Sequence, residues 1–364
     1  MKLTVNGALV AAMLAVGMPA SAQDRRDADT QSLEEQIQQL VSAVVAQATA
    51  VARDVLRSQG NAGSQGNTDR RGPEFTESFS RTIRLGPNGT FDLSNIAGDI
   101  TVNGGGGDDV RIQATKRVRG RAQSDAQGAL REIDIQIVER SGLVQVRTEG
   151  TNRRYLGAAV DYTIALPSGA SLILRSVSGD TRVSNVKGEV RIESVSGNVR
   201  LSSIGRLRSL KSVSGDVDIT DVDTDDLAGT VISGDLKVRN LKARSVEFSS
   251  VSGDVRFDDV SSDRVSLKTV SGDIQYSGRF VRNGRYELQS HSGDVMLVPL
   301  GSPAFDLDAS TLNGEVRSDF ALSGNTTSRG NGRSGTHALR GSVGQGGALV
   351  SIRTFSGDVV VAKR

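Results

Sequence analysis

Apolar and polar residues alternate through most of the chain beyond residue 168. In each stretch an apolar residue follows a recurring acidic position and another stands two places further on, as at Val255 and Phe257. A second alternating pair, such as Val246 and Phe248, precedes the next acidic position. A period of two is the spacing of a strand with one buried face. The pattern therefore predicts two short strands in each stretch.

A Ser-Gly-Asp step separates the two strands and recurs at a nearly fixed interval. The glycines from Gly179 to Gly314 are 18, 18, 19, 19, 19, 21 and 21 residues apart. A period in this range is typical of stacked-repeat proteins, in which neighbouring repeats bury the face that one repeat cannot bury alone. We therefore predict an all-β fold: a parallel β-solenoid, or single-stranded β-helix, of 18- to 21-residue Ser-Gly-Asp coils, with an N-terminal amphipathic helix.

An apolar residue also stands directly before most Ser-Gly steps, and His291 occupies this place in one repeat. We assign this column to the buried face, together with the apolar positions that follow the acidic residue. The expected interior is a set of Val, Ile and Leu ladders along the stack. The members of the column are Val177, Val195, Val213, Ile232, Val251 and Val270.

The glycine of each step fits a backbone position with positive φ, which most other residues adopt only with strain. The serine before it and the Asp or Asn after it can hydrogen-bond the backbone of a turn. The step is therefore interpreted first as a structural corner and not as reactive chemistry. The predicted turn glycines are Gly179, Gly197, Gly215, Gly234, Gly253, Gly272, Gly293 and Gly357.

The acidic residues of the steps would stack at the coil spacing, where neighbouring carboxylates repel by roughly 1 kcal/mol in water. Basic residues two positions further on would share their strand face and offset this repulsion. These are Arg182, Arg200, Lys237, Arg256 and Arg317, and the pattern is interrupted at Asp218, Gln275 and Met296. The acidic column comprises Asp180, Asn198, Asp216, Asp235, Asp254, Asp273, Asp294, Glu315 and Asp358.

A calcium ladder is the alternative interpretation of this column. Calcium repeats in β-rolls use a Gly-Gly-x-Gly-x-Asp turn, whereas each corner here has one glycine. Calcium also takes about six to eight oxygen ligands, more than one carboxylate per coil supplies. We therefore favour a structural ladder and expect neither a metal nor a cofactor. The residues that would serve as calcium ligands are Asp216, Asp235, Asp254, Asp273 and Asp294.

Three stretches carry a family resemblance. They are the run from Phe91 to Val102, Leu-Pro-Ser-Gly-Ala at 166–170, and the iterated Val-Ser-Gly-Asp-Val motif that closes at Phe355–Val359. Together they resemble the DUF4097 family of exported bacterial β-strand-repeat proteins, often labelled adhesins, over residues 75–364. The resemblance implies a β-solenoid and an envelope location. It supplies neither a ligand nor catalytic residues.

The N-terminal residues have a different organisation. A positive start, an apolar stretch at Ala8–Val16 and a small-residue cleavage box predict a secretory signal peptide at 1–22. Residues 23–57 are predicted to form an amphipathic helical segment, because apolar residues recur at intervals of three or four. Residues 58–74 are rich in Gly, Asn, Ser, Gln and Arg, and this composition predicts a flexible linker.

The β body is predicted in two parts, an irregular N-terminal region at 75–167 and regular solenoid repeats at 168–364. A short helix is expected at 124–133, and a Gly/Ser-rich loop at 323–347. Gly104–Gly107 lacks the Lys and the Ser or Thr of a phosphate loop and is expected to be a hairpin turn. No segment beyond the signal peptide is apolar for long enough to span a bilayer.

The residue types leave little room for an enzyme. The two histidines are His291 and His337, and neither an H-E-x-x-H nor a G-x-S-x-G motif is present. The chain has no Trp and four Tyr, whereas sugar sites use aromatic platforms. A net charge of +2 does not point to nucleic acid. Because there is no cysteine, neither a disulfide nor a lipoprotein anchor is available.

These patterns predict a non-enzymatic exported envelope protein, in the periplasm or at the cell surface, whose β-solenoid serves as a scaffold or adhesin-like binding surface. The expected partner is an envelope protein, a polysaccharide or another copy of the chain, with no catalytic residue. Two alternatives remain open. One is sensing of envelope stress through the helix at residues 30–57, and the other is a carbohydrate-active solenoid enzyme.

Overall fold

The computed structural model describes residues 73–119, 123–149, 158–329 and 336–364, which belong to one compact unit. Almost all of them lie in the strands of one sheet, and their helix is α2 (Gln123–Glu132). No helix in these ranges has the length and apolar character of a membrane span. The predicted signal peptide, the N-terminal helix and nearly all of the predicted linker lie outside the described residues.

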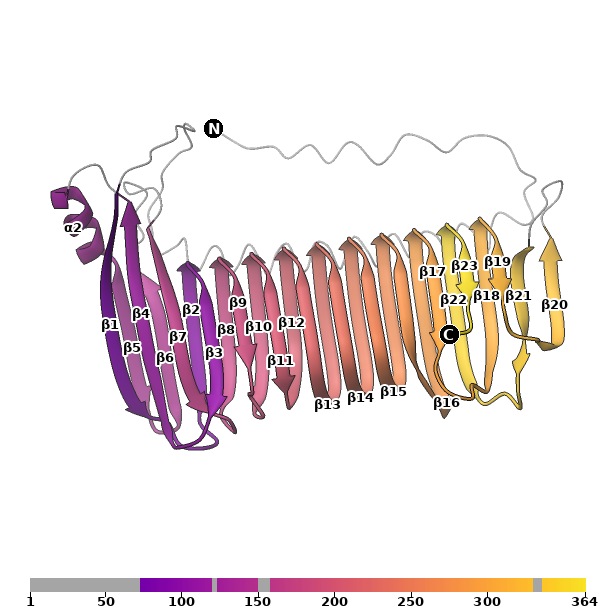
Figure 1. Cartoon of the computed structure of the whole chain (residues 1–364), viewed down its shortest axis with the longest axis horizontal. Helices are drawn as coiled ribbons and strands as arrows, with labels where there is room; N and C mark the ends of the chain where they lie inside the picture. Colours follow the sequence, from indigo (N-terminus) through magenta and orange to yellow (C-terminus); the bar gives the residue numbers. More distant parts are fainter. Residues whose placement is uncertain (1–72, 120–122, 150–157, 330–335) are drawn as a thin grey trace. The chain divides into compact units, whose positions relative to one another are not determined.

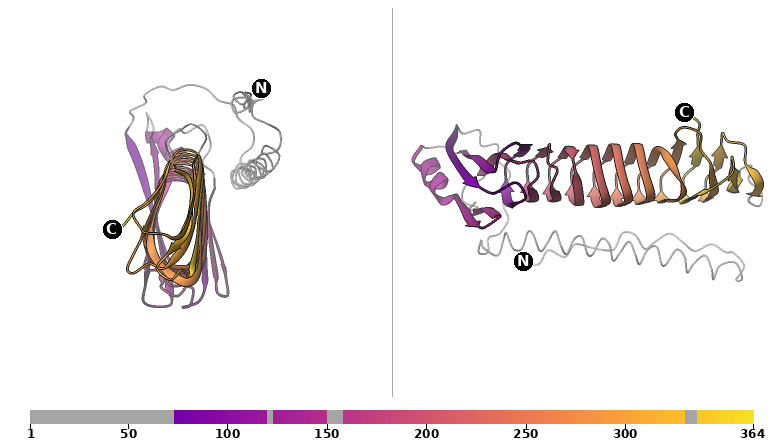
Figure 2. Two further views of the ribbon diagram at one scale, coloured as in Figure 1. Left: turned by 90° about the vertical axis from the view of Figure 1, so that its right-hand side faces the viewer. Right: turned by 90° about the horizontal axis from the view of Figure 1, so that it is seen from below.

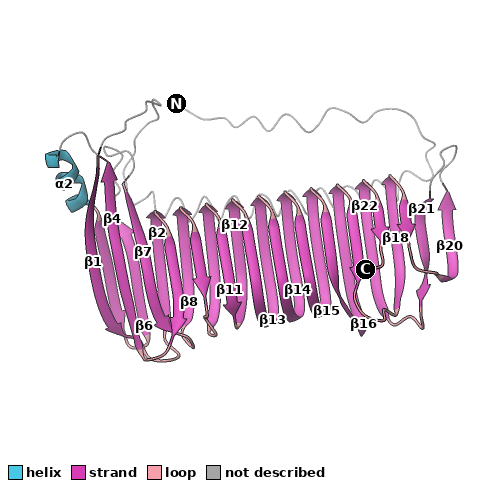
Figure 3. Cartoon of the chain, viewed as in Figure 1, coloured by secondary structure: helices cyan, strands magenta, loops and turns pink. Residues whose placement is uncertain are grey.

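The middle of the fold consists of long strands that each form most of one coil (Figures 1 and 3). Both halves of each strand pair in parallel with the same neighbour, and Val217, Leu236, Val255 and Ile274 lie in one register column. Viewed along the stack, the coils form a narrow closed loop (Figure 2). The strands are β13 (Val217–Ser233), β14 (Leu236–Ser252), β15 (Val255–Ser271) and β16 (Ile274–Ser292).

Shorter strands divide the coils before this central group. In each coil one strand leads into a Ser-Gly corner and another leaves it, and every one pairs in parallel with its counterpart in the next coil. The strands are β8 (Ser171–Ser178), β9 (Thr181–Ser184), β10 (Glu189–Ser196), β11 (Val199–Ile204) and β12 (Arg206–Ser214).

The first coil of the stack comes from a distant part of the sequence. Strands β2 (Thr90–Ala97) and β3 (Ile100–Gly105) pair in parallel with β8 and β9. Their other edges pair with β6 and β7, and β5, β4 and β1 then add in antiparallel order. These covering strands are β1 (Glu74–Arg84), β4 (Asp109–Arg119), β5 (Asp134–Arg140), β6 (Leu143–Glu149) and β7 (Ala159–Pro167).

Helix α2 packs on β1 and β4 and buries Ala126, Ala129 and Leu130. It therefore covers the N-terminal end of the stack, where a solenoid would otherwise expose its core. The turn that contains Gly106 and Gly107 joins β3 to β4. The expectation of a hairpin there is wrong, because both strands pair with β7 and not with each other.

The C-terminal coil lies between two earlier ones. Strands β22 (Ala348–Ser356) and β23 (Val359–Val361) pair with β16 and β17 on one side and with β18 and β19 on the other. The order of coils in space therefore departs from the order in the sequence. The other strands of this region are β17 (Val295–Pro299), β18 (Phe305–Asn313) and β19 (Val316–Ser318).

The predicted loop at 323–347 is largely strand, which corrects the sequence interpretation. It contains β20 (Ser323–Arg329) and β21 (Thr336–Val343), which pair in antiparallel fashion. Strand β21 also pairs with the outer edge of β18, and its Leu339 and Val343 are buried. An unpaired strand edge is a strong template for another strand, and this outweighs the turn-rich composition of the segment.

One inward assignment is also wrong. The apolar residues directly before the Ser-Gly steps are partly exposed, because the buried side chains are those one position earlier. Val190 and Ile192 point inward, so strand alternation places Ser194 inside and Val195 outside. The columns after the acidic residue are buried as expected, including Val255 and Phe257.

Small hydroxyl side chains fill the narrow interior beside the corner. Ser290 Oγ donates to the Gly272 carbonyl oxygen at 3.3 Å, and Thr311 Oγ1 donates to that of Gly357 at 2.8 Å. These hydrogen bonds satisfy corner carbonyls that point along the stack. Thr354 Oγ1 likewise donates to the Gly293 carbonyl oxygen at 3.2 Å. The other hydroxyls of the column have no hydrogen-bond partner among the described residues, and Val231 takes the same register position, so small size and not donation is what the members share. Its buried hydroxyl members are Ser176, Ser194, Ser212, Ser250, Thr269, Ser290, Thr354 and Thr311.

Candidate functional site

The acidic column forms a continuous hydrogen-bonded line, which we call the corner ladder. At each step one side-chain oxygen accepts the backbone N–H of the equivalent residue in the next coil, at 2.7 to 3.1 Å. In spatial order the ladder comprises Asp161, Asp99, Asp180, Asn198, Asp216, Asp235, Asp254, Asp273, Asp294, Asp358 and Glu315.

The corner glycines make this line possible. Gly253 has a φ of 119°, and a Cβ atom built on it would lie 2.2 Å from the Gly234 carbonyl oxygen. The same close approach recurs along the stack. A side chain is therefore excluded both by backbone conformation and by space. All eight glycines assigned to the turns have a φ between 117° and 144°.

The remaining carboxylate oxygens have fewer partners. Arg182 and Arg200 lie 3.1 and 3.7 Å from Asp180 Oδ2, and Lys237 lies 3.8 Å from Asp235 Oδ2. Arg317 pairs with Glu315, and this hydrogen bond raises the pKa of Arg317. Arg256 does not join the ladder, contrary to expectation. It pairs with Asp258 at 2.8 Å, an acidic residue further along the same strand face.

The geometry gives a cation little to bind. One oxygen of each ladder side chain already accepts a backbone N–H, so each coil has about one oxygen left, whereas calcium takes about six to eight. Among the described residues, no group of three or more His, Cys, Asp or Glu side chains could hold a metal ion. We propose that the ladder, including the five aspartates considered as calcium ligands, is structural.

Asn198 provides a natural test of this proposal, because its amide oxygen accepts the Asp216 N–H at 2.9 Å without a charge. We expect Asp254→Asn to leave the melting temperature within a few degrees of wild type, since the Asp273 N–H keeps an acceptor. Asp254→Ala should cost about 1 to 2 kcal/mol, because that acceptor is lost. Thermal melts check both.

The same melts, repeated with millimolar calcium and with a chelator, should coincide. A cation held by the ladder would instead stabilise the fold in proportion to the logarithm of its excess over Kd. A large calcium-dependent rise that disappears in Asp254→Asn combined with Asp273→Asn would show that the ladder is a metal site.

A second polar column lies at the opposite bend and was missed in the sequence. Its residues have φ between 53° and 59°, a region in which Asn and Asp are enriched. The available signal was an Asn, Asp or Ser six residues after most corner glycines. Its members are Asn185, Ser203, Asp221, Asn240 and Asp259.

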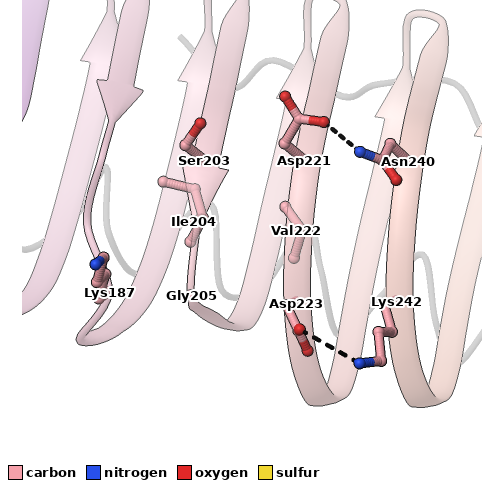
Figure 4. A pocket seen from close by; sticks show the side chains of 9 residues that line it. All are labelled: Lys187, Ser203, Ile204, Gly205, Asp221, Val222, Asp223, Asn240 and Lys242. Atoms are coloured by element: carbon pink, nitrogen blue, oxygen red, sulfur yellow. Dashed lines mark hydrogen bonds and ion pairs between the residues drawn. The ribbon is translucent and has the colours of Figure 1, made fainter.

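This bend contains an open pocket of about 570 Å³ (Figure 4). Its polar side chains are largely occupied with each other. Asn240 Nδ2 donates to Asp221 Oδ1 at 2.5 Å, and Lys242 lies 3.7 Å from Asp223. These interactions link neighbouring coils. The polar groups of the pocket therefore connect neighbouring coils and leave little for a ligand to bind.

The partly exposed apolar column forms a line beside the corner ladder, which we call the ridge. Near the C-terminal end of the stack His291 and Phe355 stack with ring centroids 5.0 Å apart and an interplanar angle of 14°. Leu312 follows and is 45% exposed. In spatial order the ridge comprises Ile96, Val177, Val195, Val213, Ile232, Val251, Val270, His291, Phe355 and Leu312.

The candidate reactive groups do not converge. His291 lies on the ridge, whereas His337 lies on β21 and its Nδ1 has no partner among the described residues. Tyr276 and Tyr286 point into the core, where burial raises the pKa of both. Neither ring is available as a platform for a sugar.

The parallel coils, the corner ladder and the outward ridge define a β-solenoid-like repeat protein. The family described as Toastrack DUF4097 matches residues 98–362, and the chain belongs to this family. No curated protein matches the chain.

Solved structures resemble the chain at low identity. One is a "putative adhesin" from Bacteroides fragilis NCTC 9343, 11% identical, with a TM-score of 0.39, covering 79% of this chain and 97% of that one. Two come from Parabacteroides distasonis ATCC 8503. One is a "putative adhesin", 10% identical, with a TM-score of 0.41 and coverage of 79% and 97%. The other is a "Putative lipid binding protein", 8% identical, with a TM-score of 0.41 and coverage of 78% and 96%.

Proposed function

We propose that the chain is a non-enzymatic exported protein of the bacterial envelope whose stacked coils present the ridge as a binding surface. The ridge is the observation that carries this proposal. Apolar side chains gain stability when they leave water, so an outward apolar position repeated in successive coils is a site at which another molecule can be bound. The solenoid would serve as the rigid support.

The surroundings of the ridge favour an extended partner. On one side lie the exposed corner serines, including Ser178 and Ser196, which can hydrogen-bond a polar chain. On the other side lie mixed charged positions such as Arg175 and Glu193. A polysaccharide or an extended envelope protein could follow this line over several coils. The periplasm or the cell surface is the proposed location, in keeping with the predicted signal peptide.

Binding of the mature chain to cell-envelope fragments of the producing bacterium tests the proposal. Val213→Glu combined with Val251→Glu should weaken binding at least tenfold, because charges on the ridge cannot be buried without cost. The matched control is Ser202→Glu with Ser261→Glu, which adds the same charge at exposed positions away from the ridge. Equal binding by the two variants would contradict the proposal.

Sensing of envelope stress remains an alternative prediction, since it depends on residues 30–57, which lie outside the described residues. Deletion of these residues distinguishes the two functions. A binding scaffold should still bind envelope fragments without them, whereas a sensor should lose its partner.

A further inference from the structure

The bend of β16 differs from those of the coils before it. Strand β16 has 19 residues, whereas β13, β14 and β15 have 17 each. The parallel register resumes only at Arg285, which pairs with Arg264, after Phe280 has paired with Ser262. Residues 281–284 therefore bulge outward opposite Asp263. In the preceding coils the positive-φ bend is at Asp221, Asn240 and Asp259, before the level of Asp263.

Four arginines lie on and beside the bulge, around the exposed carboxylate of Asp263. Arg264, Arg279, Arg282 and Arg285 are exposed, and within the described part of the chain none of them forms an ion pair. The preceding coils behave differently. Arg244 pairs with Asp226 across the coil boundary at 2.6 Å. At the bulge, by contrast, Arg264 stands opposite Arg285, and like charges directly opposite each other destabilise a sheet.

The backbone that presents these arginines is fixed from inside. The Tyr286 hydroxyl donates to the Ser262 carbonyl at 2.6 Å and accepts the Val281 N–H at 2.9 Å. The Phe280 ring packs on Tyr286 with centroids 4.4 Å apart, and the Asn283 N–H donates to the Gly347 carbonyl at 3.1 Å. The charges are therefore held on a preorganised bend.

Exposed apolar side chains flank the arginines. Val281, on the bulge, is 37% exposed. Leu349 of β22, which is in register with Arg285 of β16, is 50% exposed. The segment before Leu349 is held in place by Asp306, which accepts hydrogen bonds from the Ser342 hydroxyl and the Gly347 N–H. The patch is thus basic and apolar at once, and it is distinct from the ridge.

We propose that this patch docks the protein on a membrane surface that carries anionic lipids. Phosphate headgroups would neutralise Arg264, Arg279, Arg282 and Arg285, while Val281 and Leu349 enter the boundary between headgroups and acyl chains. A soluble polyanion would satisfy the arginines but would leave both apolar side chains in water. For this reason the geometry favours a bilayer. The inference does not depend on the proposed role of the ridge.

Co-sedimentation of the mature chain with lipid vesicles tests the proposal. Wild type should bind vesicles that contain about one third phosphatidylglycerol and should not bind pure phosphatidylcholine, because each arginine gains from a negative surface. Arg282→Gln with Arg285→Gln should weaken the partition about 25-fold. The matched control is Arg111→Gln with Arg140→Gln, which removes the same charge from exposed positions on β4 and β5 and should bind like wild type.

A second variant tests the apolar contribution. Leu349→Ser should weaken binding several-fold and should leave its salt dependence unchanged, because no charge is lost. Circular dichroism melts confirm that each variant is folded. Three results would overturn the proposal: no binding to anionic vesicles, equal loss in the two double variants, or binding to dextran sulfate through Arg282 and Arg285 without binding to vesicles.

Discussion

Gly253→Val should lower the free energy of unfolding by more than about 3 kcal/mol. Two costs combine at this corner. A φ of 119° is strained for any β-branched residue, and the new Cβ would lie 2.2 Å from the Gly234 carbonyl oxygen. Neither backbone can retreat easily, because Gly253 donates its N–H to the Ser271 carbonyl at 3.0 Å. Chemical denaturation of the purified variant measures the change.

Gly107→Val separates these two costs. Gly107 has a φ of 95°, yet a Cβ atom added to it would have no other atom within 4 Å, so only backbone strain applies. We expect a cost of about 1 to 2 kcal/mol there. If Gly253→Val proved no worse than Gly107→Val, the close approach between neighbouring corners would be disproved.

Phe257→Ala should destabilise the protein by about 3 to 5 kcal/mol. The side chain is fully buried in the middle of the stack, and its ring packs edge-on against Phe248 with centroids 5.6 Å apart. Val238 and Tyr276 occupy the same column in the neighbouring coils. Removal of the ring therefore leaves a cavity that both coils line. Denaturant unfolding gives the loss.

Arg256→Ala is the matched control, one residue away on the opposite face. Its side chain is 50% exposed and pairs with Asp258 at the surface. Exposed ion pairs contribute little, so a cost below about 1 kcal/mol is expected. Similar losses in the two variants would mean that the inner and outer faces of β15 are assigned wrongly.

Local features of the sequence predicted the β-rich, solenoid-like fold and the buried columns after the acidic residues. The alternation of apolar and polar residues and the choice of turn residues are each visible within a few residues, and the same pattern recurs in every repeat. The prediction for Val195 relied on its apolar character when it should have relied on strand alternation. Its apolar character suggested burial, whereas alternation from Val190 and Ile192 already placed it outside. The buried Ser194 shows that strand alternation, and not apolar character, decides which side chain points inward at this position.

Long-range arrangements could not be predicted in this way. The insertion of β22 between β16 and β18 joins segments whose local patterns are alike, so any of several neighbours would have fitted the motif. Likewise, β2 pairs with β8 although many residues separate the two strands in the sequence. The partner of Arg256 was also missed, because Asp258 lies two residues on, within the same reach as the ladder.

Cysteine labelling tests the central claim, that the ridge is an outward binding line, most directly. The chain has no cysteine, so a single introduced thiol reports on one position. In the native mature protein, the thiol of Val251→Cys should react readily with a maleimide, and envelope fragments should slow the reaction. The thiol of Ser250→Cys should react only after unfolding, since Ser250 is 5% exposed. Faster reaction at position 250 than at 251, or no protection of 251 by envelope fragments, would contradict the account.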